Sequence, residues 1–346
     1  MTIISIFTFL LIPILFLYKV EFNEENKEVL SLNQTLQMKG LFAIFVVLVH
    51  FSQRMSNAGA MKIFQTPGYL AVGVFFFLSG YGIYSSYLKN RENLLKKTII
   101  RILHIYKPLV FVTLIYILIT IFYFGNRYPI SDIMLNMMNI RQIDGITWYL
   151  LVMVYFYISF YIAYEYFGKE RGEMWLFILS GIILIVAILI KGKEIWWYNT
   201  TFLFYIGVFF KKNEEKIKKI FKNKEIHLFI TVFLLLSGHL LFFKENVITQ
   251  SIITILFVFS FMILNFKIKY NSKVFTLLGV ISFEIYIVHM KLFKIIFREN
   301  MFGRIGNIDF VLFFTGVIIL STIVYYIFNI KISNIKKLFI KENKSE

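Results

Sequence analysis

The 346-residue sequence contains no cysteine, only 4 prolines and a small share of charged residues. Without cysteine the chain cannot form a disulfide, a thiolate nucleophile or a cysteine-ligated metal site. Its five histidines are scattered, with no HxxxH pair and no cluster with carboxylates, so the sequence predicts no metal site. Charged residues make up 16% of the chain and hydrophobic residues 58%, whereas an ordinary soluble domain is about 25% charged. This balance excludes a soluble globular domain and indicates a protein embedded in lipid.

The apolar residues gather in runs long enough to cross a bilayer, which takes about 20 mostly apolar residues in a helix. The first run has no Lys or Arg before it and no small-residue cleavage site after it, so we expect a retained span rather than a signal peptide. The sequence predicts an all-α polytopic integral membrane helix bundle with about 11 transmembrane helices. Their expected positions are 2–18, 36–53, 69–88, 107–124, 146–167, 174–190, 195–210, 226–243, 246–265, 274–290 and 309–330.

Basic residues are concentrated in alternate loops, which predicts the orientation of the chain. Lys and Arg number 37 against 20 Asp and Glu, giving a net charge of +17. The loops on one side of the predicted bundle hold 26 of these basic residues and those on the other side hold 11. Because cytoplasmic loops carry the excess, we expect a plasma-membrane protein with its N-terminus outside and its C-terminus in the cytoplasm. The basic balance therefore reflects topology, and we expect no nucleic-acid partner.

No predicted loop is long enough for a separate soluble domain, and no internal repeat is visible. We expect one membrane domain over 32–332, preceded by an extra N-terminal transmembrane helix and cytoplasmic loop over 1–31. A basic cytoplasmic tail over 333–346 follows it. The lysine-rich segment 211–224 is typical of a solvated anchor at the membrane surface.

Two ionisable residues, Lys39 and His50, lie in the second predicted span. Such groups cost a few kcal/mol inside a bilayer unless they are buried and used, so they mark functional sites. Eleven residues of helix turn through about 1100°, which places both groups on one face about 16 Å apart. One groove can therefore contact both side chains.

Four motifs occur in an order that resembles the acyltransferase-3 family of integral membrane acyltransferases. They are the basic-x10-His spacing of Lys39 and His50, the Phe-Phe-x-x-Ser-Gly stretch within Gly73–Tyr81, Trp148-Tyr149-Leu150, and the Ser-x3-Tyr-x2-His stretch Ser282–His289. The resemblance covers roughly residues 32–332. It implies transfer of an acyl group, usually acetyl, from cytoplasmic acyl-CoA to a hydroxyl of a glycan or another extracytoplasmic acceptor. The family's paired-arginine motif is half kept, because His104 stands where the second Arg is expected after Arg101.

His50 is the predicted catalytic residue. A low dielectric favours the neutral imidazole, and a neutral imidazole can remove the proton of a hydroxyl that attacks a thioester. The alternative is a structural histidine that hydrogen-bonds a neighbouring helix.

His289 lies on another predicted span at a comparable depth. On a helix, Ser282 is about 20° and Tyr286 about 60° away from it, so the three form one polar face. We expect this face to line the acceptor site together with Trp148 and Tyr149, the alternative being hydrogen bonds between helices. Glu284 points about 140° away from His289, and we expect an ion pair with a neighbouring basic side chain.

A basic stripe precedes the fourth predicted span. Lys97, Arg101 and His104 follow an i, i+4, i+7 spacing and share one helix face. Arginine clamps phosphate well, so we expect these residues and Lys39 to bind the phosphates of acyl-CoA. The alternative is ordinary anchoring by positive charge on the cytoplasmic side.

The combined prediction is a membrane O-acyltransferase with acetyl-CoA or another acyl-CoA as donor substrate, no bound cofactor and a cell-envelope or extracellular glycan as acceptor. Its other expected partners are the lipid bilayer and an envelope-biosynthesis protein. A transporter or flippase for polysaccharide or lipid-linked sugar is the rival from another class, and it would have many spans with few polar groups. A sensor or scaffold without chemistry is a third hypothesis. Direct transfer and a transient acyl-enzyme on Tyr or Ser both remain open.

Overall fold

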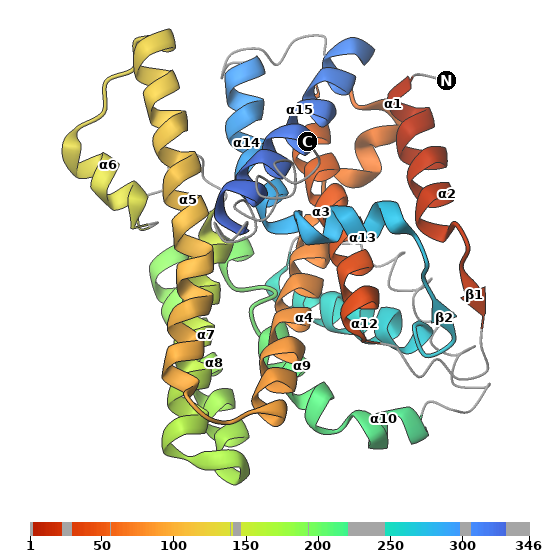
Figure 1. Cartoon of the computed structure of the whole chain (residues 1–346), viewed down its shortest axis with the longest axis vertical. Coiled ribbons are helices and arrows are strands. Elements are labelled where there is room, and N and C mark those ends of the chain that lie inside the picture. Colours follow the sequence, from red (N-terminus) through yellow and green to blue (C-terminus); the bar gives the residue numbers. More distant parts are fainter. Residues whose placement is uncertain are drawn as a thin grey trace, which may run out of the picture.

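The structure is a computed structural model of the chain, and it describes residues 3–22, 30–55, 57–138, 140, 147–192, 194–220, 246–297 and 306–329. These residues fold as a bundle of α-helices (Figure 1). Within the described ranges, strands occur only as the short antiparallel pair β1 (Glu21–Phe22) and β2 (Ile268–Lys269), in which Glu21 lies opposite Lys269. The all-α membrane bundle expected from the sequence is confirmed.

Seven described helices are long and apolar enough to cross a membrane. Each overlaps one of the predicted spans. They are α3 (Leu32–Ser52), α4 (Gly68–Lys89), α5 (Leu94–Phe124), α7 (Trp148–Tyr166), α8 (Gly168–Lys191), α12 (Val247–Leu264) and α15 (Asn307–Asn329).

Shorter helices complete the described part of the chain. The N-terminal run is one apolar stretch of α1 (Ile3–Ile6), a π-helical turn (Phe7–Leu11) and α2 (Ile12–Leu17), which is where the first span is predicted. The others are the 3-10 helices Gly59–Phe64 and Ile195–Trp197 and the α-helices α6 (Ile130–Met137), α9 (Leu203–Lys212), α10 (Glu214–Ile220), α13 (Lys273–Val280) and α14 (Ser282–Phe297).

Three predicted spans differ from the helices observed. The span expected at 195–210 is a short 3-10 turn followed by the 10-residue helix α9. The span expected at 274–290 is divided at Ile281 into α13 and α14. Helix α5 begins at Leu94, well before the predicted start at 107, so its basic stripe is helical as expected. The span predicted at 226–243 and the tail 333–346 lie outside the described residues.

Glycines allow α4 and α9 to pack with their backbones in contact. A methyl group at Gly80 would collide with the carbonyl oxygen of Phe204, and one at Gly207 would collide with the carbonyl oxygen of Phe77. Small residues of this kind are typical of close helix contacts in membranes, where packing rather than hydrophobic burial drives association. The final glycine of the Phe-Phe-x-x-Ser-Gly motif therefore holds two helices together.

Helix α3 is clamped against α13 in a similar way. A methyl group at Gly279 would collide with the carbonyl oxygen of Leu36. Beside this contact, Gln34 and Gln37 donate from Nε2 to the carbonyl oxygen of Tyr270 at 2.7 and 2.9 Å. Their side-chain oxygens accept the backbone N–H groups of Tyr270 and Ser272 at 2.9 and 2.8 Å. These buried hydrogen bonds fix the start of α13, and through it α14, against α3.

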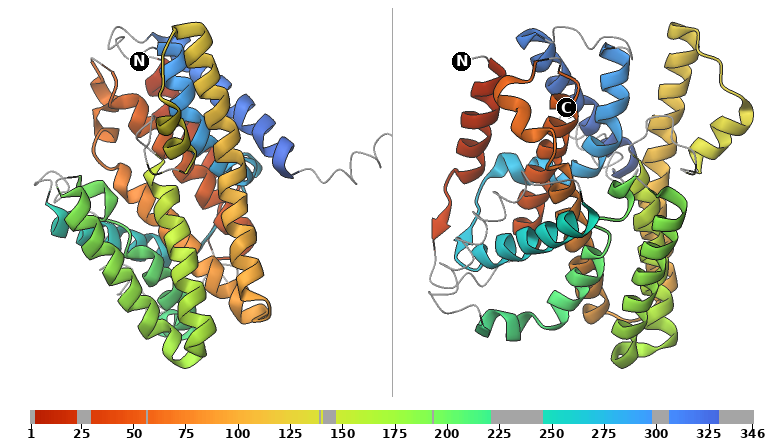
Figure 2. Two further views of the ribbon diagram at one scale, coloured as in Figure 1. Left: turned by 90° about the vertical axis from the view of Figure 1, so that its left-hand side faces the viewer. Right: turned by 180° about the vertical axis from the view of Figure 1, so that it is seen from behind.

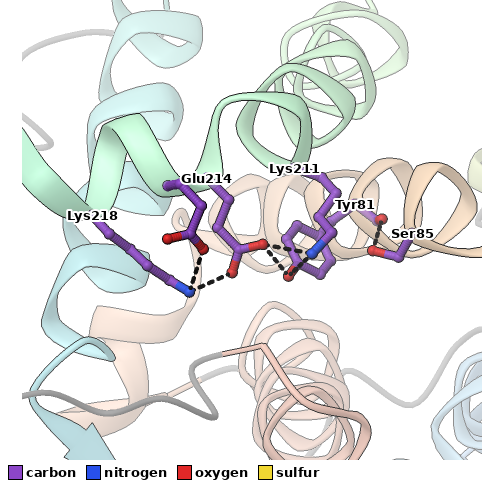
Figure 3. A network of polar contacts seen from close by, with 6 residues as sticks. Tyr81, Ser85, Lys211, Glu214 and Lys218 are labelled. Atoms are coloured by element: carbon purple, nitrogen blue, oxygen red, sulfur yellow. Dashed lines mark hydrogen bonds and ion pairs between the residues drawn. The ribbon is translucent and has the colours of Figure 1, made fainter. Parts of the chain in front are cut away.

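A polar network joins α10 to the end of α4 (Figure 3). The hydroxyl of Tyr81 donates to Glu214 Oε2 at 3.0 Å, and Lys211 Nζ contacts the same oxygen at 2.6 Å. Lys218 Nζ lies 3.1 Å from Glu214 Oε1. Burial acts to raise the pKa of Glu214, but the hydrogen bonds and charges of the two lysines outweigh it and hold this pKa below its ordinary value.

The helices that lie along α5 form two groups, one beside each half of this long helix, and the groups meet at the centre of the molecule. Figure 2 shows α7 and α8 as an antiparallel pair beside the first half of α5, while α14 and α15 lie beside its second half. Helix α12 runs across the long helices and contacts α4. The residues expected to be functional come from α3, α5, α7 and α14, which converge where these groups meet.

Candidate active site

Two histidines from different helices face each other. The rings of His50 on α3 and His289 on α14 are stacked, with centroids 5.3 Å apart and planes inclined by 29°. His289 is fully buried, and its Nδ1 lies 3.0 Å from the carbonyl oxygen of Ile285. Because a carbonyl oxygen only accepts hydrogen bonds, this contact assigns the proton of a neutral ring to Nδ1. A pair of imidazoles at this distance can pass a proton to and from one reacting group.

Polar residues surround His50 at the end of α3. Arg54 donates from Nη1 to the carbonyl oxygen of His50 at 2.9 Å, and its guanidinium lies over the ring of Phe293. The side chain of Gln53 interacts with the His50 imidazole and donates to the carbonyl oxygen of Gln65 at 2.7 Å. The sequence interpretation missed Gln53, Arg54 and Gln65. The polar run Ser52-Gln53-Arg54, one residue after His50, was the available signal for the first two of these residues.

A line of aromatic side chains extends from the histidine pair. The centroid of Tyr286 lies 6.1 Å from that of His289 and 5.5 Å from that of Tyr149. Tyr149 in turn packs against Phe76 at 4.7 Å, and Trp148 lies 6.4 Å from Phe76. The structure therefore brings four of the five residues predicted for the acceptor site into one continuous group with His50.

Ser282 is the fifth of these residues, and it lies apart from the aromatic line. It is the first residue of α14, and its hydroxyl donates to the carbonyl oxygen of Gly279 at 2.8 Å. This local bond satisfies a backbone group where α13 ends and α14 begins. The hydroxyl is used at the junction between the helices.

A second set of polar residues leads from Tyr149 toward α5. The side chain of Ser79, from the Phe-Phe-x-x-Ser-Gly motif, interacts with the hydroxyl groups of both Tyr149 and Tyr157. Tyr157 interacts electrostatically with the guanidinium of Arg101. Arg101 also donates from Nη2 to the Ser86 hydroxyl at 2.9 Å. A path of polar side chains therefore connects Arg101 with the group around His50.

Arg101 lines a cavity of about 460 Å³ that lies between α5, α7, the α13–α14 junction and the end of α15. Its Nη1 atom is buried and has no hydrogen-bond partner in the described part of the chain. A buried guanidinium nitrogen without a hydrogen-bond partner is costly. The polar residues that line the cavity are Arg101, His104, Lys107, Tyr157, Glu284, Tyr325 and Asn329.

Only some residues of the predicted donor site line the cavity. Arg101 and His104 line the cavity together, with Lys107 beside them. Lys97 does not line it and donates to the carbonyl oxygen of Asn90 at 2.8 Å. Lys39 is half-buried on α3 and does not line the cavity either. The cavity therefore combines two members of the predicted stripe.

No three His, Asp or Glu side chains of the described ranges come together in a way that could hold a metal ion. The chemistry that the described groups offer is proton transfer at the histidine pair and anion binding at the cavity. Imidazole supplies the first, and guanidinium and ammonium groups supply the second.

Comparison with known proteins identifies a family. Residues 37–330 match the sequence model of a family described as an acyltransferase domain. No curated protein and no solved structure is significantly similar to the chain. The match includes every residue of the histidine pair, the aromatic line and the cavity.

Proposed function

Because the chain belongs to the acyltransferase-3 family of membrane acyltransferases, we propose that it is an O-acetyltransferase of the cell envelope. In this proposal the donor is cytoplasmic acetyl-CoA or a related acyl-CoA, and the acceptor is a hydroxyl of a cell-envelope or extracellular glycan. The observation that carries the proposal is the stacked pair His50 and His289. A chain of interacting side chains, through Tyr286, Tyr149, Ser79 and Tyr157, links this pair to Arg101 in the wall of the basic cavity.

The donor occupies the cavity with its phosphates at the cations of α5. Arg101 lines the cavity and gives planar donors for a phosphate. His104 and Lys107 add donors on the same wall. Lys97 and Lys39 contribute positive charge outside the cavity. The charge distribution of the loops supports a cytoplasmic position for this end of α5.

The acyl group reacts at the histidine pair. The acceptor hydroxyl attacks the thioester carbonyl, and His50 takes the hydroxyl proton as the new C–O bond forms. The C–S bond then breaks, and the thiolate of CoA leaves with the proton that the imidazole returns. His289 supports the proton transfer from the facing ring, and Tyr286, Tyr149 and Trp148 form an aromatic wall for the sugar.

The glycan approaches from the outer side of the membrane in this proposal. His50 lies in the last turn of α3, and Arg54 follows the end of this helix, where the loop counts predict the outer surface. Donor and acceptor therefore enter from opposite sides and meet at His50. An envelope-biosynthesis protein is the partner that would deliver the glycan.

The test is turnover of acetyl-CoA by purified protein in lipid nanodiscs. Wild type is compared with His50→Ala and with Phe122→Ala, a matched control whose ring is 82% exposed to lipid or solvent. Release of CoA that depends on His50 and rises when envelope glycan is added supports the proposal. Folded wild type that releases no CoA with any glycan would exclude it and favour the transporter hypothesis.

A further inference from the structure

Glu284 is a buried acid that the proposed reaction does not use. It lies in the first turn of α14, its residue is 4% exposed, and it lines the cavity that contains Arg101. The sequence predicts an ion pair for it. In the described ranges, however, no basic side chain lies within ion-pair distance of its carboxyl group.

Two other acids of the described chain, the buried Glu214 and the half-buried Glu173, differ in this respect. Glu214 is held by Lys211 and Lys218, and Glu173 is held by Lys212. A carboxylate is an acceptor only, and burying it without a donor is costly. The carboxyl group of Glu284 accepts from its own backbone N–H group. The residue lines the cavity, so a ligand there can donate a further hydrogen bond to a carboxyl group that no cation holds.

The position of Glu284 along α14 indicates which part of a ligand reaches it. His289 follows five residues later, which is about 7.5 Å further along the helix axis. The cations that would hold phosphates are all on α5, on a different wall of the cavity. A phosphate beside Glu284 would be repelled, whereas the section of acyl-CoA between its phosphates and its thioester carries no charge.

That section is the pantetheine arm, which carries two amide N–H groups. We propose that Glu284 accepts a hydrogen bond from a pantetheine amide and so positions the thioester beside His50 and His289. This inference rests on the proposed function, because it needs a CoA thioester as donor. Glu284 acts here as a positioning and specificity residue, since it contacts the donor away from the reacting atoms.

The experiment compares two donors on four proteins in nanodiscs. The donors are acetyl-CoA and S-acetylpantetheine, which keeps both amides and lacks the phosphates. The proteins are wild type, Glu284→Leu, Glu284→Gln and Arg101→Gln. Michaelis parameters are measured with a fixed excess of envelope glycan, and the melting temperature of each protein is measured beside them.

We expect Glu284→Leu to raise KM about tenfold or more, by a similar factor for both donors. Glu284→Gln keeps a carbonyl acceptor and should recover most of the loss. Arg101→Gln should raise KM for acetyl-CoA and leave S-acetylpantetheine nearly unchanged, because the second donor has no phosphate. This crossed pattern requires separate contacts to the two parts of the donor.

Three results would overturn the inference. An increase in KM for acetyl-CoA alone would place Glu284 beside the nucleotide part of the donor. A lower melting temperature and lower kcat with unchanged KM for both donors would make the residue purely structural. Wild type that cleaves neither thioester would exclude the proposed function as well, whereas the first two results leave that function in place.

Discussion

The histidine pair predicts a specific failure of additivity. If His50 and His289 handle one proton together, removal of either ring disables the same step. Loss of a general base typically costs 10²–10⁴ in rate, or about 3–5 kcal/mol at the transition state. Their rings are 5.3 Å apart, well within the range over which mutational effects couple. We expect His50→Ala, His289→Ala and the double variant to lower kcat by similar factors.

The assay is single-turnover acetyl transfer to glycan in nanodiscs, with acetyl-CoA above its dissociation constant, so that only chemistry is observed. The binding of acetyl-CoA to each variant is measured separately, because a catalytic role leaves it nearly intact. Tyr123→Phe, at a tyrosine that is 73% exposed, is the matched control for aromatic substitution. A double variant whose loss equals the product of the two single losses would refute a shared proton-transfer step.

Three further predictions concern the helix contacts and hydrogen bonds that surround the site. Gly80→Ala forces a methyl group against a backbone carbonyl of α9 and should lower the melting temperature by several degrees, while Gly82→Ala, with open space around it, should not. Because the pKa of Glu214 is lowered, the stability that this residue contributes should be complete at neutral pH and be lost as acid protonates it. Because the pKa of Lys218 is raised, its contribution should be lost only above about pH 10.5. In a plot of melting temperature against pH, Glu214→Gln should therefore flatten both the acid and the alkaline limb. Gln37→Leu removes two buried backbone contacts, so both the melting temperature and the acetyl-transfer rate should fall.

Hydrophobic run length was sufficient to predict the long helices. A bilayer demands about 20 apolar residues for each span and leaves few alternatives to a helix. The prediction worked well for α3, α4, α7 and α15, where one run forms one helix. It worked less well where an apolar run contains a turn, because apolar composition is the same on both sides of a break such as Ile281.

Candidate site residues could be named from spacing, but their partners could not. Helical periodicity places Tyr286 near His289, and the structure agrees. It also places Ser282 on the same face, yet that hydroxyl is used by the carbonyl oxygen of Gly279, because the helix begins there. The stacking of His50 on His289 depends on how two distant segments pack, and one sequence contains no measure of that distance.

The division between α13 and α14 explains how one segment can both pack against α3 and carry residues of the candidate site. Helix α13 packs across α3 through the close contact at Gly279, and α14 then leaves in another direction (Figure 1). A continuous helix over 274–290 would extend along the direction of α13 and carry Glu284 and His289 away from their present walls. Because the chain turns at Ile281, Glu284 lines the cavity and His289 faces His50. Helix α14 therefore fixes the distance between Glu284, which would hold the donor, and His289. A shift of this helix would change donor binding and proton transfer together.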